Sequence, residues 1–275
     1  MVLLHLRRSV LVAAAAASLV VGSSAAWAGP GAVASTVAVS GASPFAGCTA
    51  DAVASQAGTN YPNTEVEPWI AASTVDRNGD GTPDAITGYQ QDRWSNGGSR
   101  GVAASVLYQD GWRQVTIPGT SACAGGARYV RASDPWVSFS PNGVAYFFTL
   151  GTDVAGIQSA MLVNRSTDGG LTWSAPTVLI DENDPEHFND KNSLTADPLN
   201  SNYAYAIWDR SRFPSDQRYQ HSTAGFPRSL RSDAYFSRTT TGGLTWEAPH
   251  AIYAPRANQF GIGSVHLRLV LRKAR

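Results

Sequence analysis

Short runs of residues that alternate between apolar and polar, or that are rich in β-branched and aromatic side chains, follow one another along the chain. VAYFFTL at residues 144–150 and YAYAIW at residues 203–208 are two such runs. Both patterns are typical of β-strands, in which successive side chains point to opposite faces of a sheet. The chain is therefore predicted to be an all-β protein.

One eight-residue phrase occurs twice between such runs. It reads STDGGLTW at residues 166–173 and TTTGGLTW at residues 239–246. Its Gly-Gly pair can adopt the positive φ of a tight hairpin, and its Asp or Thr can accept hydrogen bonds from amides of the turn. Its Trp can pack under the neighbouring strand. We expect each copy to form a hairpin turn between two strands.

A larger repeated unit surrounds this phrase. A shorter version, YQDGW, lies at residues 108–112, and similar segments begin at Glu67 (EPWIAAS), Asp134 (DPWVSFS) and Lys191 (KNSLTAD). The spacing suits units of four strands with loops of variable length. The chain is predicted to repeat a four-stranded antiparallel unit about three times.

The composition supports this fold class and argues against nucleic acid and membranes as binding partners. Of the 275 residues, 43% are hydrophobic, only 15% are charged and 26 are Gly, as expected for an all-β globular protein. The 21 basic and 21 acidic residues balance, so no net field draws the protein to nucleic acid or to an anionic membrane. We expect neither as a partner of the mature protein.

Residues 1–28 are predicted to be a signal peptide. Arg7 and Arg8 precede an apolar run at residues 10–21, and Ala26 and Ala28 form a small-residue cleavage signal before Gly29. The run is too short to cross a membrane as a helix, which needs about 20 residues. The mature protein is expected to be secreted and extracellular, with residues 29–59 as an N-terminal extension.

The chain contains two cysteines, Cys48 and Cys123. In an oxidising compartment they can form one disulfide that closes a long loop. A metal site or a catalytic thiol is the alternative, but neither cysteine has a Cys-x-x-Cys partner. We therefore expect the disulfide.

The repeated phrase matches the Asp-box, or BNR repeat, Ser/Thr-x-Asp-x-Gly-x-x-Trp. The matching residues are Ser166, Asp168, Gly170 and Trp173 in the first copy, and Thr239, Gly243 and Trp246 in the second copy, where Thr241 replaces the Asp. From residue 60 to about residue 262 the chain resembles the secreted sialidase-like six-bladed β-propellers. The resemblance implies four-stranded blades, of which about three to three and a half are present. It also implies that the boxes lie on the face away from the active site.

Charged loops are expected on the face opposite the boxes. Asp92 and Arg93 follow the second strand of the first unit, and Asp209 and Arg210 are taken as their counterparts in the third unit. The starts of the first strands carry further charges, at Glu65, Glu67, Arg131, Asp134, Asp190 and Lys191. Such pairs also hold loops together as salt bridges, but several pairs on one predicted face indicate a pocket.

The resemblance to sialidases also implies roles for these residues. Sialidases bind the carboxylate of the sugar with three arginines, use an Asp as general acid/base, and use a Tyr activated by a Glu as nucleophile. By loop position, the candidates are Arg93, Arg131 and Arg210 for the carboxylate, Asp92 and Asp134 for acid/base catalysis, and Asp190 and Asp209 for further substrate contacts. The Arg-Ile-Pro signature of the family is absent, and the nucleophilic Tyr and its Glu are not identified.

The segment DRNGDGTPD at residues 76–84 has the pattern of a calcium-binding loop. Asp76, Asn78, Asp80 and Asp84 stand at positions 1, 3, 5 and 9 of the loop, and such oxygen ligands suit Ca²⁺. Position 12 lacks the Glu of an EF-hand, so the loop resembles the calcium-binding hairpins of the FG-GAP type. A polar turn held by Asx hydrogen bonds is the alternative. We expect a structural Ca²⁺ and no organic cofactor.

Residues 263–275 form an atypical basic tail, and three units with the start of a fourth do not close a six-bladed ring. We interpret this as a truncated or frame-shifted reading frame. The leading hypothesis is a sialidase-like glycoside hydrolase, or its N-terminal half, which removes terminal sialic-acid-type sugars from glycoconjugates. The alternatives are a non-catalytic Asp-box propeller that binds glycans or proteins, and a degraded gene product without a stable fold.

Overall fold

The computed structural model describes residues 36–51, 55–109, 111–126, 128–154, 157–213 and 231–255. Nearly all of them belong to one compact unit, Ala38–Arg275. The predicted signal peptide and the predicted basic tail lie outside the described residues. In the part of the chain that the structure describes, no helix is long and apolar enough to span a membrane.

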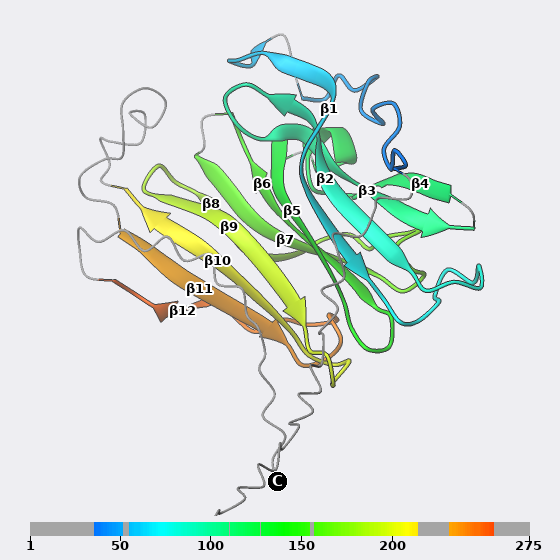
Figure 1. The fold of residues 1–275 in the computed structure, drawn as a ribbon. Helices are drawn as coiled ribbons and strands as arrows, with labels where there is room; N and C mark the ends of the chain where they lie inside the picture. Colours follow the sequence, from blue (N-terminus) through cyan, green and yellow to red (C-terminus); the bar gives the residue numbers. More distant parts are fainter. Residues whose placement is uncertain are drawn as a thin grey trace, which may run out of the picture. The chain divides into compact units, whose positions relative to one another are not determined.

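The described chain consists of three four-stranded antiparallel blades, which confirms the predicted all-β propeller architecture. Blade 1 contains β1 (Asn60–Ala72), β2 (Ala85–Trp94), β3 (Ser99–Tyr108) and β4 (Gly111–Thr116). Blade 2 contains β5 (Arg131–Phe139), β6 (Ala145–Thr152), β7 (Gln158–Ser166) and β8 (Thr177–Asn183). Blade 3 contains β9 (His187–Ala196), β10 (Ala204–Arg212), β11 (Arg231–Thr239) and β12 (His250–Tyr253). The first strands of successive blades are neighbours, since β1 lies beside β5 and β5 beside β9 (Figure 1).

The hydrophobic core lies between the blades. One cluster joins Ile86 and Val106 of blade 1 to Phe147 of blade 2. A second cluster joins Tyr146 and Phe148 of blade 2 to residues of blade 3 that include Trp208. Alternate side chains of β6 thus enter different clusters, and this strand is buried along its whole length. Burial on both faces explains why the 144–150 run is almost entirely apolar.

The two copies of the repeated phrase form the predicted hairpin turns. Gly169 and Gly170 have φ values of 69° and 97°, and Gly242 and Gly243 have values of 67° and 84°. Non-glycine residues rarely adopt this left-handed conformation. The first copy joins β7 to β8 and the second joins β11 to β12.

Side chains of the phrase hold both turns in the same way. Ser166 Oγ accepts a hydrogen bond from the Gly170 amide at 2.9 Å, and Asp168 Oδ1 accepts one from the Thr172 amide at 2.9 Å. In the second copy, Thr239 Oγ1 accepts from the Gly243 amide at 2.9 Å. There Thr241 Oγ1 accepts from the Thr245 amide, also at 2.9 Å. A hydroxyl therefore replaces the carboxylate of Asp168 as the acceptor.

Each turn also rests on the preceding blade. A Cβ added to Gly170 would lie 2.5 Å from Ile86 Cδ1, and one added to Gly243 would lie 2.6 Å from Tyr146 Cε1. Trp246 also makes an edge-to-face contact with Tyr146 of the preceding blade, with ring centroids 6.4 Å apart, whereas Trp173 contacts Phe147 of its own blade at 5.7 Å. The phrase therefore fastens one blade to the next as well as turning the chain.

The predicted disulfide between Cys48 and Cys123 is present, with a Cα–Cα distance of 5.6 Å. It ties the N-terminal extension to the connection between blades 1 and 2. Nearby, Asp51 forms a buried ion pair with Arg100 at 2.7 Å. Phe45 packs on Gly101, where a Cβ would lie 2.5 Å from its ring.

Candidate functional site

The first strand of each blade is interrupted at the same place. Glu67, Asp134 and Lys191 have φ values of 53°, 51° and 53°, and the pairing with the second strand shifts beside each of them. Positive φ is uncommon for such residues and is found at functional sites more often than elsewhere. A bulge re-aims the side chains around it. Three charged side chains are therefore presented at the same level of neighbouring strands.

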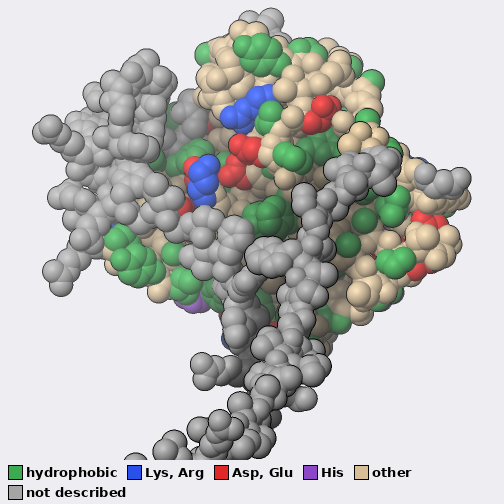
Figure 2. Space-filling model, viewed as in Figure 1, with side chains coloured by type: hydrophobic (Ala, Val, Ile, Leu, Met, Phe, Trp, Pro, Cys, Tyr) green, Lys and Arg blue, Asp and Glu red, His purple; other side chains and the backbone are tan. Residues whose placement is uncertain are grey.

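These three bulges line a cavity of about 290 Å³. Each blade contributes three consecutive residues, which are Glu67, Pro68 and Trp69, then Asp134, Pro135 and Trp136, then Lys191, Asn192 and Ser193. Figure 2 shows acidic and basic side chains gathered close together on one face of the molecule. We name this feature the axial cavity.

The charged groups of the axial cavity interact closely. The Lys191 ammonium lies 3.6 Å from Asp190 Oδ1 and 3.9 Å from Asp134 Oδ2. Partial removal from water, which leaves 33% of the Asp190 side chain exposed, raises the pKa of its carboxyl to about 6, and the negative charge of Asp134 contributes to the same shift. The charge of Asp190 in turn raises the pKa of Lys191, with smaller contributions from Asp134 and Glu67. The site thus combines a carboxyl group of raised pKa with a neighbouring carboxyl group and a cation.

Polar neighbours hold the carboxylates in place. Ser133 Oγ donates a hydrogen bond to Asp134 Oδ1 at 2.7 Å, and Gln90 Nε2 donates one to Glu67 Oε2. Asn192 Nδ2 donates to the Asp134 carbonyl at 2.9 Å. The Oδ1 atom of Asn192 is buried and has no hydrogen-bond partner among the described residues. These hydrogen bonds hold the Asp134 and Glu67 carboxylates in place and leave one buried polar atom without a partner among the described residues.

Two tryptophans form an apolar wall of the axial cavity. The rings of Trp69 and Trp136 are stacked, with centroids 3.6 Å apart and planes 20° apart. Trp69 Nε1 donates a hydrogen bond to the Val137 carbonyl at 3.0 Å, which fixes the ring. Sequence reasoning used these residues only to find the repeat. The signal that could have assigned them to the site is the recurrence of Pro-Trp directly after an acidic residue, at Glu67 and Asp134.

Of the residues predicted for catalysis and substrate binding, only Asp134 lines the axial cavity. Asp190 lies next to it, within 3.6 Å of the Lys191 ammonium that lines the cavity. Glu67 and Lys191, which sequence reasoning left without a role, join them. The other predicted residues do not line this cavity.

Asp92 of β2 lies where the N-terminal extension packs against β1. Its side chain is fully buried. It accepts hydrogen bonds from Ser43 Oγ at 2.7 Å and from the Asn63 amide at 2.8 Å. These contacts give the carboxylate a structural role and do not fit the predicted acid/base role.

Arg131 holds a loop together. It is 2% exposed, and its guanidinium donates to Asn96 Oδ1, the Gly97 carbonyl and the Ala57 carbonyl at 2.9, 2.6 and 3.0 Å. The guanidinium also lies 4.5 Å from the ring centroid of Trp94. Burial lowers the pKa of Arg131 to about 10, and the charge of Arg93 adds to this effect. Few donors of Arg131 are left for a sugar carboxylate.

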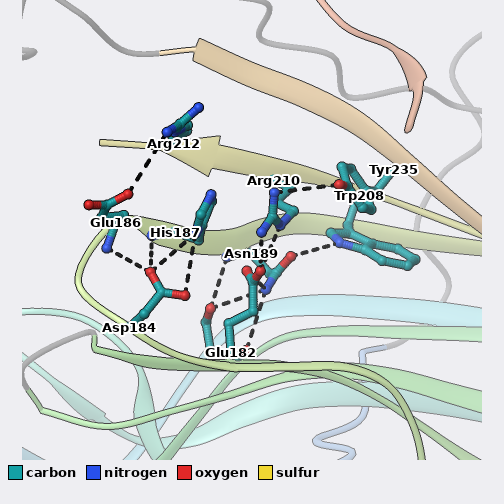
Figure 3. A network of polar contacts seen from close by, with 10 residues as sticks. Glu182, Asp184, Glu186, His187, Asn189, Trp208, Arg210, Arg212 and Tyr235 are labelled. Carbon is teal, nitrogen blue, oxygen red and sulfur yellow. Dashed lines mark hydrogen bonds and ion pairs between the residues drawn. The ribbon is translucent and has the colours of Figure 1, made fainter. Parts of the chain in front are cut away.

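Arg210 belongs to a second polar network, which Figure 3 shows between β8, β9, β10 and β11. Its Nε atom donates to Glu182 Oε1 at 2.8 Å, and its guanidinium lies 5.2 Å from the ring centroid of Tyr235. Glu182 Oε2 also accepts from Asn189 at 3.0 Å. Arg210 is therefore already paired with a carboxylate. Of the remaining candidates, Asp209 is buried on β10 and Arg93 donates to Gln90 Oε1 at 2.6 Å.

The expected equivalence of Asp92-Arg93 with Asp209-Arg210 is wrong. On β1 Val66 pairs with Gln90, and on β9 Asp190 pairs with Asp209. Because Val66 and Asp190 both directly precede the bulge residue, Asp209 corresponds to Gln90 and not to Asp92. The two acid–base pairs are offset by two positions in the ladder, which only the strand pairing reveals.

The network in Figure 3 also contains a group that sequence reasoning did not find. Ligand atoms of Glu182, Asp184 and His187 lie within 4.8 Å of one another. Asp184 Oδ1 accepts hydrogen bonds from the amides of Glu186 and His187 at 2.7 and 2.8 Å. This geometry could hold a cation, but the Arg210 guanidinium already neutralises Glu182.

The predicted calcium loop between β1 and β2 is held by its own side chains. Asp76 accepts from the amides of Gly79 and Gly81 at 2.6 and 2.8 Å. Asp84 is fully buried and accepts from the Arg77 amide at 2.9 Å. Asp80 accepts from the Gln109 amide at 2.6 Å. The all-oxygen donor set is of the kind that Ca²⁺ prefers.

Comparison with known proteins gives no family. No known family model matches the chain, and no curated protein matches it. Among solved structures, an α-L-arabinofuranosidase from Fusarium graminearum with an iminosugar inhibitor is similar over 68% of this chain and 50% of its own, with 9% identity and a TM-score of 0.43. An α-L-arabinanase from Penicillium chrysogenum with arabinobiose is similar over 69% of this chain and 56% of its own, with 12% identity and a TM-score of 0.41. The chain spans about half the length of these two proteins.

Proposed function

We propose that the protein is a glycoside hydrolase whose reaction takes place in the axial cavity. The observation that carries this proposal is the Asp134–Asp190–Lys191 group, in which the Lys191 ammonium lies 3.6 Å from Asp190 and 3.9 Å from Asp134. The raised pKa of Asp190 supports it. Glycoside hydrolysis needs an acid that protonates the departing oxygen and a carboxylate that assists attack at the sugar carbon. We assign the acid role to Asp190. Asp134, or Glu67 from the neighbouring blade, supplies the carboxylate.

The apolar wall supports a sugar as the substrate. Sugar rings present C–H groups on their faces, and these pack against the flat surfaces of aromatic side chains. Trp69 and Trp136 provide such surfaces beside the carboxylates. A small number of polar groups on an otherwise apolar lining is the usual composition of a ligand pocket.

The charge of the axial cavity bears on the class of sugar. Three carboxyl groups, of Glu67, Asp134 and Asp190, face one cation, Lys191. An anionic sugar would meet net negative charge there, whereas a neutral sugar would not. Arg131 and Arg210, which the sialidase hypothesis requires for the sugar carboxylate, are bound to other groups. We therefore favour a neutral terminal sugar over sialic acid and retain sialidase activity as the competing specificity.

A second candidate function is glycan binding without hydrolysis. The Lys191 ammonium lies within 4 Å of both Asp134 and Asp190, so these two carboxyl groups can serve as its ion-pair partners in place of a catalytic role. If Glu67 does not serve as the second carboxylate, the axial cavity would bind a sugar and leave its glycosidic bond intact.

The test is a panel of fluorogenic glycosides, neutral and sialic-acid-bearing, assayed between pH 4 and pH 8. Release of the fluorophore from a neutral glycoside is expected, and the substitution Asp190→Asn should lower kcat/KM about 10²- to 10⁴-fold. Glu247→Gln, a change of an exposed carboxylate on another surface, should leave it unchanged. Release from the sialoside alone would favour the sialidase. Sugar binding without release from any glycoside would favour the second candidate.

We further propose that the protein acts outside the cell and that its 76–84 loop binds Ca²⁺ as a structural ion. The first proposal rests on the signal-like residues 1–28 and on the disulfide. For the second, EDTA should lower the melting temperature of the wild-type protein, and added Ca²⁺ should restore it. The variant Asp76→Asn should lose this response. A melting temperature that EDTA does not change would contradict the proposed calcium site.

A further inference from the structure

The outer face of blade 3 repeats a contact surface that blade 2 uses to hold blade 3. In blade 2, Tyr146 of β6 and Arg165 of β7 are directly paired across the sheet. Arg165 Nε donates a hydrogen bond to the Gly242 carbonyl at 2.8 Å. Gly243 lies so close to the ring of Tyr146 that any Cβ at this position would overlap it. A Tyr and an Arg thus form a socket for a Gly-Gly turn.

The same pair occurs one blade further on. Tyr205 of β10 and Arg238 of β11 are directly paired, at the register positions that correspond to Tyr146 and Arg165. The ring of Tyr205 is stacked with that of Phe236, with centroids 6.3 Å apart. Its hydroxyl donates to Asp197 at 3.1 Å. The position and orientation of the pair are therefore fixed by its own blade.

Among the described residues, no Gly-Gly turn between the third and fourth strands of a blade occupies this second socket. The turns at 169–170 and 242–243 rest on blades 1 and 2. The Arg238 side chain is 44% exposed and pairs with Glu247, which is 41% exposed, at 2.7 Å. Such an exposed ion pair is weak, because water screens both charges, and a carbonyl acceptor can replace it.

We propose that Tyr205 and Arg238 form a docking socket for the Gly-Gly hairpin turn of a further four-stranded blade outside this chain. The occupant has a defined chemistry. It carries two glycines in the left-handed conformation, a carbonyl that accepts from Arg238, and a Trp three residues after the second glycine that contacts the ring of Tyr205. This surface is separate from the axial cavity, so the inference does not depend on the proposed function.

The probe is a synthetic cyclic peptide with the sequence TTTGGLTW of residues 239–246 and a fluorescent label, titrated with the full chain by fluorescence polarisation. Saturable binding is expected. The matched control peptide, TTTAALTW, should bind at least tenfold more weakly, because its added methyl groups meet the tyrosine ring and its backbone disfavours positive φ.

Variants of the protein separate this socket from the one in blade 2. Arg238→Ala and Tyr205→Ala should each weaken binding at least tenfold, whereas Tyr205→Phe should retain it. Arg212→Ala, at the other end of β10, should have no effect. Thermal melting shows whether each variant is folded. Equal binding of both peptides, no saturable binding, or binding unaffected by Arg238→Ala in a folded protein would overturn the proposal. Light scattering could instead detect a stable dimer that Arg238→Ala weakens. That result would show that a second copy of the chain occupies the socket, and it would also contradict the proposal.

Discussion

At the scale of single residues, the chemistry of the axial cavity depends on the pKa values of its carboxyl groups, which burial and neighbouring charges set. Asp190 has a raised pKa because its carboxyl is partly removed from water and lies next to Asp134. A buried acid beside a like charge keeps its proton at a higher pH than it would in water. Catalytic groups are commonly tuned in this way, so that one acid can donate a proton at a pH where its neighbour is ionised.

The pH dependence of activity should report this tuning. If protonated Asp190 is the acid, kcat/KM should fall about tenfold per pH unit well above pH 6, because the reactive form disappears there. In Asp134→Asn the neighbouring charge is lost, so this limb should move to lower pH in whatever activity remains. The profile measured on a neutral fluorogenic glycoside checks this. A limb that stays in place would contradict the coupling of the two residues.

The raised pKa of Asp190 should also make the stability of the folded protein depend on pH, in a direction that can be stated in advance. The folded pKa of Asp190, about 6, lies above its ordinary value of 3.8. Its contribution to stability is therefore complete below about pH 4 and is lost as the pH rises to 6 and above. Thermal melting of wild-type protein and Asp190→Asn should thus differ most in favour of the variant at pH 7–8.

At the scale of elements, the hairpin turns are the parts that join blades. Their glycines are needed twice, once for positive φ and once because the preceding blade leaves no room for a Cβ. The third, shorter turn before β4 has no such constraint, since a Cβ at Gly111 would meet no described atom within 4 Å.

The comparison of two glycine substitutions tests this. Gly243→Ala should destabilise the protein by about 2–4 kcal/mol, because strain at positive φ adds to overlap with the buried Tyr146 ring. Gly111→Ala, the matched control, should change the free energy of unfolding by less than about 0.5 kcal/mol. Urea denaturation measures both values. Equal effects would show that blade contact does not constrain Gly243.

At the scale of the whole molecule, covalent and polar contacts attach the N-terminal extension to the propeller. The Asp51–Arg100 ion pair and the hydrogen bond from Ser43 to Asp92 fix it to blade 1, and the disulfide fixes it to the connection between blades 1 and 2. The extension also supplies the carbonyl of Ala57 to Arg131, which begins the second blade. Covalent and polar contacts thus link segments that are far apart in the sequence.

Removal of the disulfide should therefore loosen more than one segment. The bond joins residues 75 positions apart, and a loop of this length contributes roughly 4 kcal/mol in the chain-entropy model. The double variant Cys48→Ser, Cys123→Ser should have a markedly lower melting temperature than the oxidised protein. Wild-type protein under reducing conditions should match the variant. An unchanged melting temperature in both would show that the extension is held without the bond.

The amino-acid sequence by itself determined the strands, the two Gly-Gly turns and the disulfide pairing. These features depend on local patterns, such as alternation, left-handed glycines and the presence of only two cysteines. The sequence also indicated that charge gathers at the first strands, which placed Asp134 and Asp190 among the candidates.

Only the tertiary structure decided which charged residues meet. The bulges at Glu67, Asp134 and Lys191 shift the register of each blade, and a shift of this kind cannot be read from residue spacing. The partners of Arg131 and Arg210 likewise come from distant segments. Whether an arginine is available to a ligand depends on these long-range contacts, because a guanidinium that is already paired inside the protein has few donors left to offer.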